Sequence, residues 1–72
     1  MMPPLNASDA VWRDFLRERN AVGLLELWYW AADEGHQRIK DMVVTTIGCR
    51  ALASVARMRM RGQLPHDMPC NE

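Results

Sequence analysis

The feature that most constrains the fold is the run of residues 24–32, which is apolar at every position except Glu26. Wound into a helix, this run places apolar side chains on all sides. Such a helix lies at the centre of a core or has one side against a partner. The chain has 72 residues, and a chain of this length can hardly surround a whole helix. The sequence therefore predicts a central helix over residues 21–33 and a second copy of the chain that completes the core.

The flanking segments also predict helices, so the expected fold class is all-α. Asn6 or Ser8 can cap a helix over residues 8–19, whose apolar and charged side chains fall on opposite faces, and Asn20 and Gly23 loosen the chain after it. No proline interrupts residues 36–61, which predict one long helix. We expect a small helical hairpin or a three-helix arrangement with a long C-terminal helix, completed by homodimerisation.

Residues 43–47 leave an alternative open within that long helix. They are five β-branched residues in a row, and the breaker Gly48 follows them. This combination suits a strand better than a helix. A lone strand has nothing to pair with in this chain, because no second β-rich run exists. We therefore favour the helix, and a strand would need a second copy of the chain.

The whole chain, residues 1–72, is expected to form a single helical domain with irregular ends. Prolines predict an extended N-terminus over residues 1–7, and residues 63–72 contain two prolines and no periodic pattern, which predicts a flexible tail. No charge-free stretch approaches the roughly 20 residues of a membrane span, and no signal peptide is recognisable. We expect a cytoplasmic protein without membrane contact.

The residues that could bind a metal or catalyse a reaction do not form a recognisable site. The soft metal ligands lack the paired spacings of zinc sites; they are His36, Cys49, His66 and Cys70. We expect Cys49 to be a small buried side chain and both cysteines to stay reduced. A nucleophile needs a base and an orienting group in a pocket, and so short a chain encloses little pocket. The sequence predicts no metal, no cofactor and no catalytic residue, hence no enzyme.

A basic stripe is the feature that most suggests a partner. Residues 42–64 contain four arginines and no acid, although the net charge of the whole chain is zero. At about 100° per residue, most of these arginines fall on one side of a helix. Interfaces are enriched in Arg, Met, Trp and Tyr. The predicted partner-binding residues are Trp28, Tyr29, Trp30, Arg50, Arg57, Met60 and Arg61.

These observations predict a small non-enzymatic regulator or inhibitor that binds another protein and acts by steric occlusion. A host transcription factor or a defence complex would be such a partner. Eight arginines against one lysine are typical of high-GC bacterial genomes, and short helical dimers without enzymatic activity are common among phage and mobile-element products. This class of protein is the leading expectation.

A small DNA-binding regulator of the helix-turn-helix type is the alternative. Ala31 and Gly35 have the four-residue spacing of the tight contact and turn in that motif, and residues 36–40 or the arginine stripe could reach bases or phosphates. Against it, Asp41 occupies a position that should close the core with an apolar side chain. Steep loss of affinity with salt would distinguish a nucleic-acid binder from a protein binder.

Overall fold

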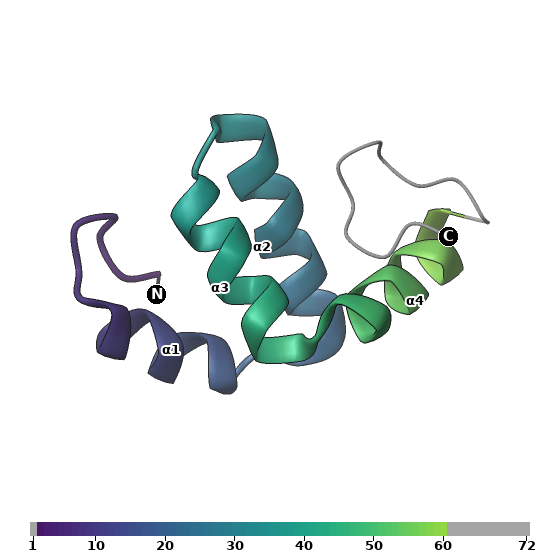
Figure 1. The fold of residues 1–72 in the computed structure, drawn as a ribbon, viewed down its shortest axis with the longest axis horizontal. Helices are drawn as coiled ribbons and strands as arrows, with labels where there is room; N and C mark the ends of the chain where they lie inside the picture. Colours follow the sequence, from purple (N-terminus) through teal and green to yellow (C-terminus); the bar gives the residue numbers. More distant parts are fainter. Residues whose placement is uncertain (1, 61–72) are drawn as a thin grey trace.

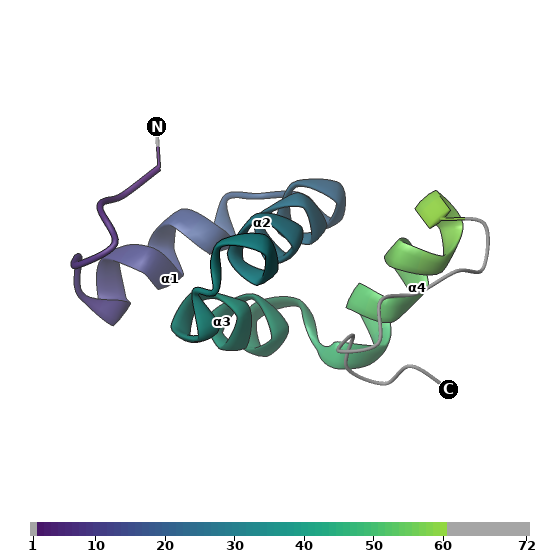
Figure 2. The same ribbon diagram turned by 90° about the horizontal axis from the view of Figure 1, so that it is seen from above.

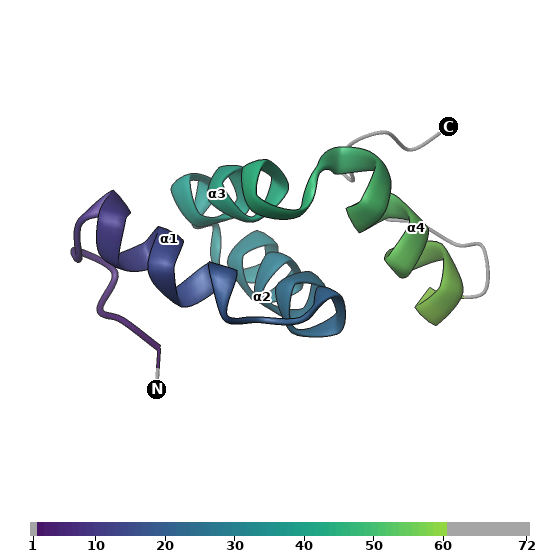
Figure 3. The same cartoon turned by 90° about the horizontal axis from the view of Figure 1, so that it is seen from below.

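The protein is described from a computed structural model, which places residues 2–60 of the chain. Within this range the fold is all-α, with four helices and no strand; the helices are α1 (Asp9–Arg17), α2 (Ala21–Glu34), α3 (Gln37–Ile47) and α4 (Cys49–Met60). Helices α2 and α3 form an antiparallel hairpin, and α1 and α4 lie on opposite sides of it (Figure 1, Figure 2 and Figure 3). The tail predicted for residues 63–72 lies outside the described residues.

Side chains and backbone at the helix ends explain where α1 and α2 begin and where α2 stops. The Ser8 hydroxyl accepts a hydrogen bond from the amide of Val11 at 3.4 Å, and the Asn20 side chain accepts one from Gly23 at 2.8 Å. Gly35 closes α2 in the left-handed conformation, with φ 76° and ψ 27°. The helices predicted over residues 8–19 and 21–33 are confirmed, with small shifts at their ends.

The predicted long C-terminal helix is wrong, because the chain breaks at Gly48. This residue has φ 92° and ψ 140°, a conformation far from helical that side chains with a β-carbon rarely adopt. Its carbonyl accepts from the amide of Leu52 at 3.0 Å and so begins α4. The alternative strand at residues 43–47 is not formed either, since these residues lie in α3. Residues 2–60 therefore form four helices instead of the expected three.

All four helices contribute to one core. Its two largest side chains, Trp12 and Trp28, come from α1 and α2. Small residues complete it where α4 meets the hairpin. The buried residues are Trp12, Leu16, Leu24, Leu25, Trp28, Ala31, Ile39, Met42, Val43, Leu52, Ala53 and Ala56. Much of the apolar surface of α2 is therefore covered by helices of the same chain.

Arg38 fastens the N-terminal segment to α3. Its guanidinium donates to the Asp9 carboxylate at 2.7 and 2.9 Å, to the Leu5 carbonyl at 2.8 Å and to the Ala7 carbonyl at 2.7 Å. A second tie comes from the Trp12 indole, which donates to the Pro4 carbonyl at 3.0 Å. The segment is not fully extended as predicted for residues 1–7, because the amide of Ala7 turns back to Pro4. These bonds hold the segment against α1 and α3.

Candidate protein-interaction surface

The side of α4 that faces away from the hairpin carries one arginine of the predicted stripe, Arg50. Leu52, Ala53 and Ala56 form the opposite, buried side of this helix. We call the exposed side the α4 outer face; its residues are Arg50, Ala51, Ser54 and Met58. Met58 is 76% exposed, the largest exposure among the large hydrophobic side chains described as exposed. A long apolar side chain therefore stands in solvent on the same side of α4 as Arg50.

The charges on α4 are weakly compensated by the described residues. Arg50 is exposed and makes no hydrogen bond or ion pair within residues 2–60. Arg59, which the prediction did not include, lies 3.8 Å from a carboxylate oxygen of Glu26. Both partners of that pair are more than half exposed, so solvent screens their attraction. Arg57 is half-buried and does have an interaction partner. The outer face therefore presents Arg50 as its available cation.

The three aromatic residues predicted as partner contacts occupy different environments. Trp28 is only 1% exposed and belongs to the core, so it is not an accessible contact residue as predicted. Tyr29 and Trp30 are half-buried. The Trp30 ring lies 5.0 Å from that of His36. Burial raises the pKa of Tyr29, an effect that the nearby positive charge of Arg59 partly offsets.

Two of the predicted contact residues cannot be placed. Arg61 lies outside the described residues, and so does the side chain of Met60. Of the predicted residues within the described range, Arg50 is therefore the one that lies exposed on the α4 outer face. Met58 was absent from the predicted set, although its position in an Arg-Met-Arg-Met-Arg sequence carried the signal.

The candidate metal ligands do not converge in the described part of the chain. No group of three or more His, Cys, Asp or Glu side chains there could hold a metal ion. Cys49 is half-buried and disulfide-bonded, which corrects the prediction of a free, buried thiol. The other cysteine of the sequence, Cys70, lies outside the described residues, as does His66. The argument from reduced cysteines for a cytoplasmic protein therefore no longer holds.

The geometry of α2 and α3 differs from that of a helix-turn-helix. The two helices lie side by side and antiparallel (Figure 1), whereas the helices of that motif cross at a steep angle. The guanidinium of Arg38 is already engaged by the N-terminal segment. Lys40 lies 5.1 Å from the centre of the Trp28 ring. The cations of residues 36–40 thus have structural contacts that compete with reading DNA.

Comparisons with known proteins identify no relative. No protein-family model matches the chain, and neither a curated protein nor a solved structure does so. In the range 2–60, none of the helices has the length and apolar character needed to cross a bilayer.

Proposed function

We propose that this chain is a small non-enzymatic regulator or inhibitor that binds another protein through the α4 outer face. Arg50 and Met58 provide the anchors, and the partner surface is acidic. The observation that carries the proposal is that the exposed Met58 and Arg50, which makes no hydrogen bond or ion pair within residues 2–60, share the side of α4 opposite its buried residues. Binding of a protein at this face would occlude a surface of that protein, as a host transcription factor or a defence complex could be occluded.

The energetics of the face favour a partner over a purely structural role. A methionine that becomes buried on association gains about 1.5–3 kcal/mol relative to exposure. Arginines and long flexible side chains recur where proteins bind one another. Arg50 and Met58 make no contribution to the core. The folding stability of this chain therefore does not explain why an arginine and a methionine occupy these two positions.

Self-association is a second part of the proposal. Met2, Phe15 and Leu27 line a shallow groove of about 330 Å³ between the N-terminal segment, α1 and α2. A second copy could cover these apolar side chains, while the α4 outer faces, which would repel each other through their arginines, stay apart. Sedimentation equilibrium tests this: we expect the mass of two chains, and of one chain for Leu27→Gln. A one-chain mass for the unaltered protein at tens of micromolar contradicts homodimerisation.

Affinity capture with matched variants tests the contact surface. Immobilised protein should retain a bacterial partner, and Arg50→Glu or Met58→Ala should weaken retention by about 1–3 kcal/mol. Arg59→Glu changes an exposed arginine of α4 outside the outer face and serves as the charge-matched control. All variants should keep the thermal unfolding midpoint of the parent. If every variant retained the partner equally well, the α4 outer face would not be the contact surface.

The salt dependence of the binding affinity distinguishes DNA binding from protein binding. A protein contact with two or three charges should lose little affinity between low and physiological salt, whereas a nucleic-acid binder loses orders of magnitude. Steeply salt-dependent binding to duplex DNA that is lost in Arg50→Glu would favour the DNA-binding alternative.

A further inference from the structure

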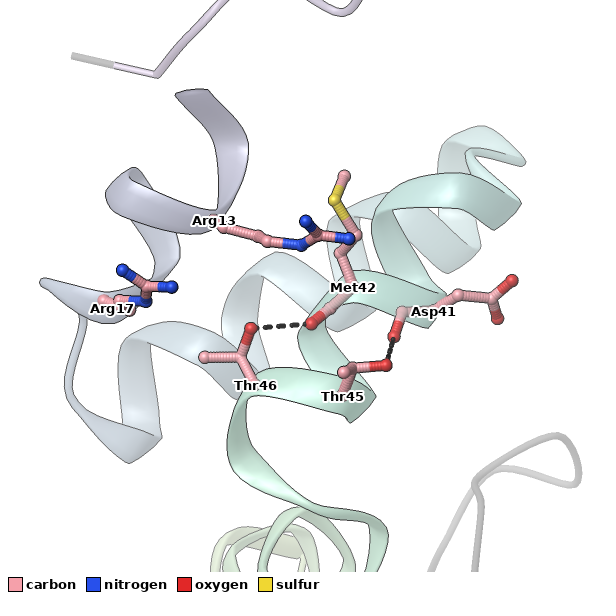
Figure 4. A pocket seen from close by; sticks show the side chains of 6 residues that line it. All are labelled: Arg13, Arg17, Asp41, Met42, Thr45 and Thr46. Atoms are coloured by element: carbon pink, nitrogen blue, oxygen red, sulfur yellow. Dashed lines mark hydrogen bonds between the residues drawn. The ribbon is translucent and has the colours of Figure 1, made fainter. Parts of the chain in front are cut away.

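A groove between α1 and α3 carries two arginines that form no hydrogen bond or ion pair with another helix within the described residues. It has a volume of about 350 Å³ and is lined by Arg13, Arg17, Asp41, Met42, Thr45 and Thr46. In Figure 4 the side chain of Arg13 extends from α1 towards Met42, Arg17 lies further along α1, and the Asp41 carboxylate points away from both arginines. The wall formed by α1 is therefore cationic, and α3 contributes Met42 and a polar wall made of Thr45 and Thr46.

The hydrogen-bond donors left in this groove are those of the guanidinium groups. The hydroxyls of Thr45 and Thr46 donate to the carbonyls of Asp41 and Met42 at 2.9 and 2.8 Å, so their oxygens can only accept a further bond. Arg13 makes no hydrogen bond or ion pair within the described residues. Any molecule that binds in this groove must therefore supply hydrogen-bond acceptors for the two arginines.

The ion pair available to Arg17 does not satisfy it. Its guanidinium lies 3.4 Å from the Asp14 carboxylate, and the two side chains are 70% and 75% exposed. A pair this exposed contributes little. Arg13 and Arg17 also stand one helical turn apart, where like charges slightly destabilise a helix. An anionic ligand would remove this repulsion.

We propose that the α1–α3 groove binds an extended acidic segment of a partner protein, with two carboxylates that accept hydrogen bonds from Arg13 and Arg17. The spacing supports this form of ligand. Four residues of helix rise about 6 Å. Side chains on the same side of an extended peptide repeat every two residues, at about 6.6 Å. A Glu-x-Glu sequence therefore presents one carboxylate to each guanidinium, and the middle residue faces the polar wall of α3.

A peptide fits this groove better than a nucleic-acid backbone does. Asp14 lies beside Arg17, and Asp41 forms part of the lining. A backbone with a phosphate at every nucleotide would place further charges near these carboxylates. A short peptide places its charges at the arginines alone and can rest uncharged atoms on Met42. The site is separate from the α4 outer face, so either can fail without the other.

Chemical-shift titration with two isomeric peptides tests the proposal. The probes are acetylated, amidated pentapeptides with the sequences Ser-Glu-Thr-Glu-Ser and Ser-Glu-Glu-Thr-Ser, which have equal charge and composition. We expect the first to shift the amides of residues around 13, 17, 42 and 45 and to bind about five-fold or more tightly than the second. Arg13→Gln should weaken the first peptide about five-fold or more, with Arg13→Lys recovering part of the loss.

The control is Arg59→Gln, which removes an exposed arginine of α4 that belongs neither to this groove nor to the α4 outer face. It should leave peptide binding unchanged, and the Arg13 and Arg59 variants should unfold at the temperature of the parent protein. Equal affinities for the two peptides, or an equal loss in Arg59→Gln, would overturn the proposal. Arg13-dependent binding of a duplex oligonucleotide at lower concentration than the peptide would overturn it too and assign the groove to nucleic acid.

Discussion

Gly48→Ala has opposite expected effects in the two architectures that the chain could adopt. In an uninterrupted helix over residues 36–61, this change would stabilise the protein by about 1 kcal/mol, since glycine is a poor helix former. In the four-helix structure Gly48 has φ 92° and ψ 140°, a conformation almost restricted to glycine. Forcing alanine into it costs about 1–3 kcal/mol. The sign of the effect therefore tests the break between α3 and α4.

The net magnitude follows from the surroundings of Gly48. A β-carbon there would meet nothing within 4 Å, so no collision adds to the backbone cost. The lower entropy of the unfolded alanine chain offsets about 0.4–1 kcal/mol. A net destabilisation of about 1–2 kcal/mol remains, and for a domain of this size each kcal/mol lowers the midpoint by about 4–8 °C. Thermal and urea unfolding followed by circular dichroism measure this loss.

Gly35→Ala is the control, because it places alanine in the milder left-handed conformation at φ 76° and ψ 27°, also without neighbours within 4 Å. We expect it to cost about 1 kcal/mol, less than the change at Gly48. A Gly48→Ala variant that melts at a higher temperature with stronger helical dichroism would refute the reasoning and restore the continuous helix.

Three further measurements probe other parts of the structure. Arg38→Ala should lower the free energy of unfolding by about 1–2 kcal/mol in urea titrations, because four hydrogen bonds at a half-exposed site are lost, and Arg38→Lys should recover only part. Burial raises the pKa of Tyr29 above its ordinary value of 10.0, so the folded state favours the protonated phenol. The contribution of this phenol to stability is complete below the pKa of the unfolded state and is lost as pH rises through the pKa of the folded state. Tyr29→Phe should therefore reduce the fall in urea midpoint between about pH 8 and about pH 11, and an unchanged fall would locate the effect elsewhere. EDTA should leave the circular dichroism spectrum unchanged, and a large loss of helical signal would reveal a metal site.

Local signals in the sequence were enough to predict α1 and α2. Ser8 and Gly35 act on neighbouring backbone groups, so the sequence shows both the cap and its helix. The role predicted for Asn20 is to loosen the chain, but its side chain instead caps α2 by accepting a hydrogen bond from the amide of Gly23. An asparagine just before an apolar run carried that signal.

Gly48 marks a possible break in the sequence, but the absence of proline over residues 36–61 favours a continuous helix. Glycine can sit inside a helix or end one, and its own sequence neighbourhood does not decide between these. In this structure Gly48 ends a helix, and the change of direction lets Leu52 and Ala56 of α4 pack in the core. That packing depends on residues of α2 and α3. Tertiary contacts of this kind cannot be derived from a single periodic pattern.

The roles of individual polar and aromatic residues required the tertiary structure for the same reason. Arg38 binds Asp9 across 29 positions of sequence, so no local spacing predicts the pair. Trp28 and Trp30 lie in one apolar run, where periodicity does not distinguish a buried from a half-buried ring. The α1–α3 groove likewise joins Arg13 to Thr46 only because the hairpin packs beside α1.

The small contact between α4 and the hairpin has a consequence for local unfolding. Among its described side chains, α4 buries one leucine and two alanines in the core, so undocking it exposes little apolar area. Segments held in this way open at a lower free energy than the whole domain. Amide hydrogens of α4 should therefore exchange with solvent before those of α2. A partner that binds only docked α4 would slow this exchange, so hydrogen exchange could report binding even when the rest of the chain stays unchanged.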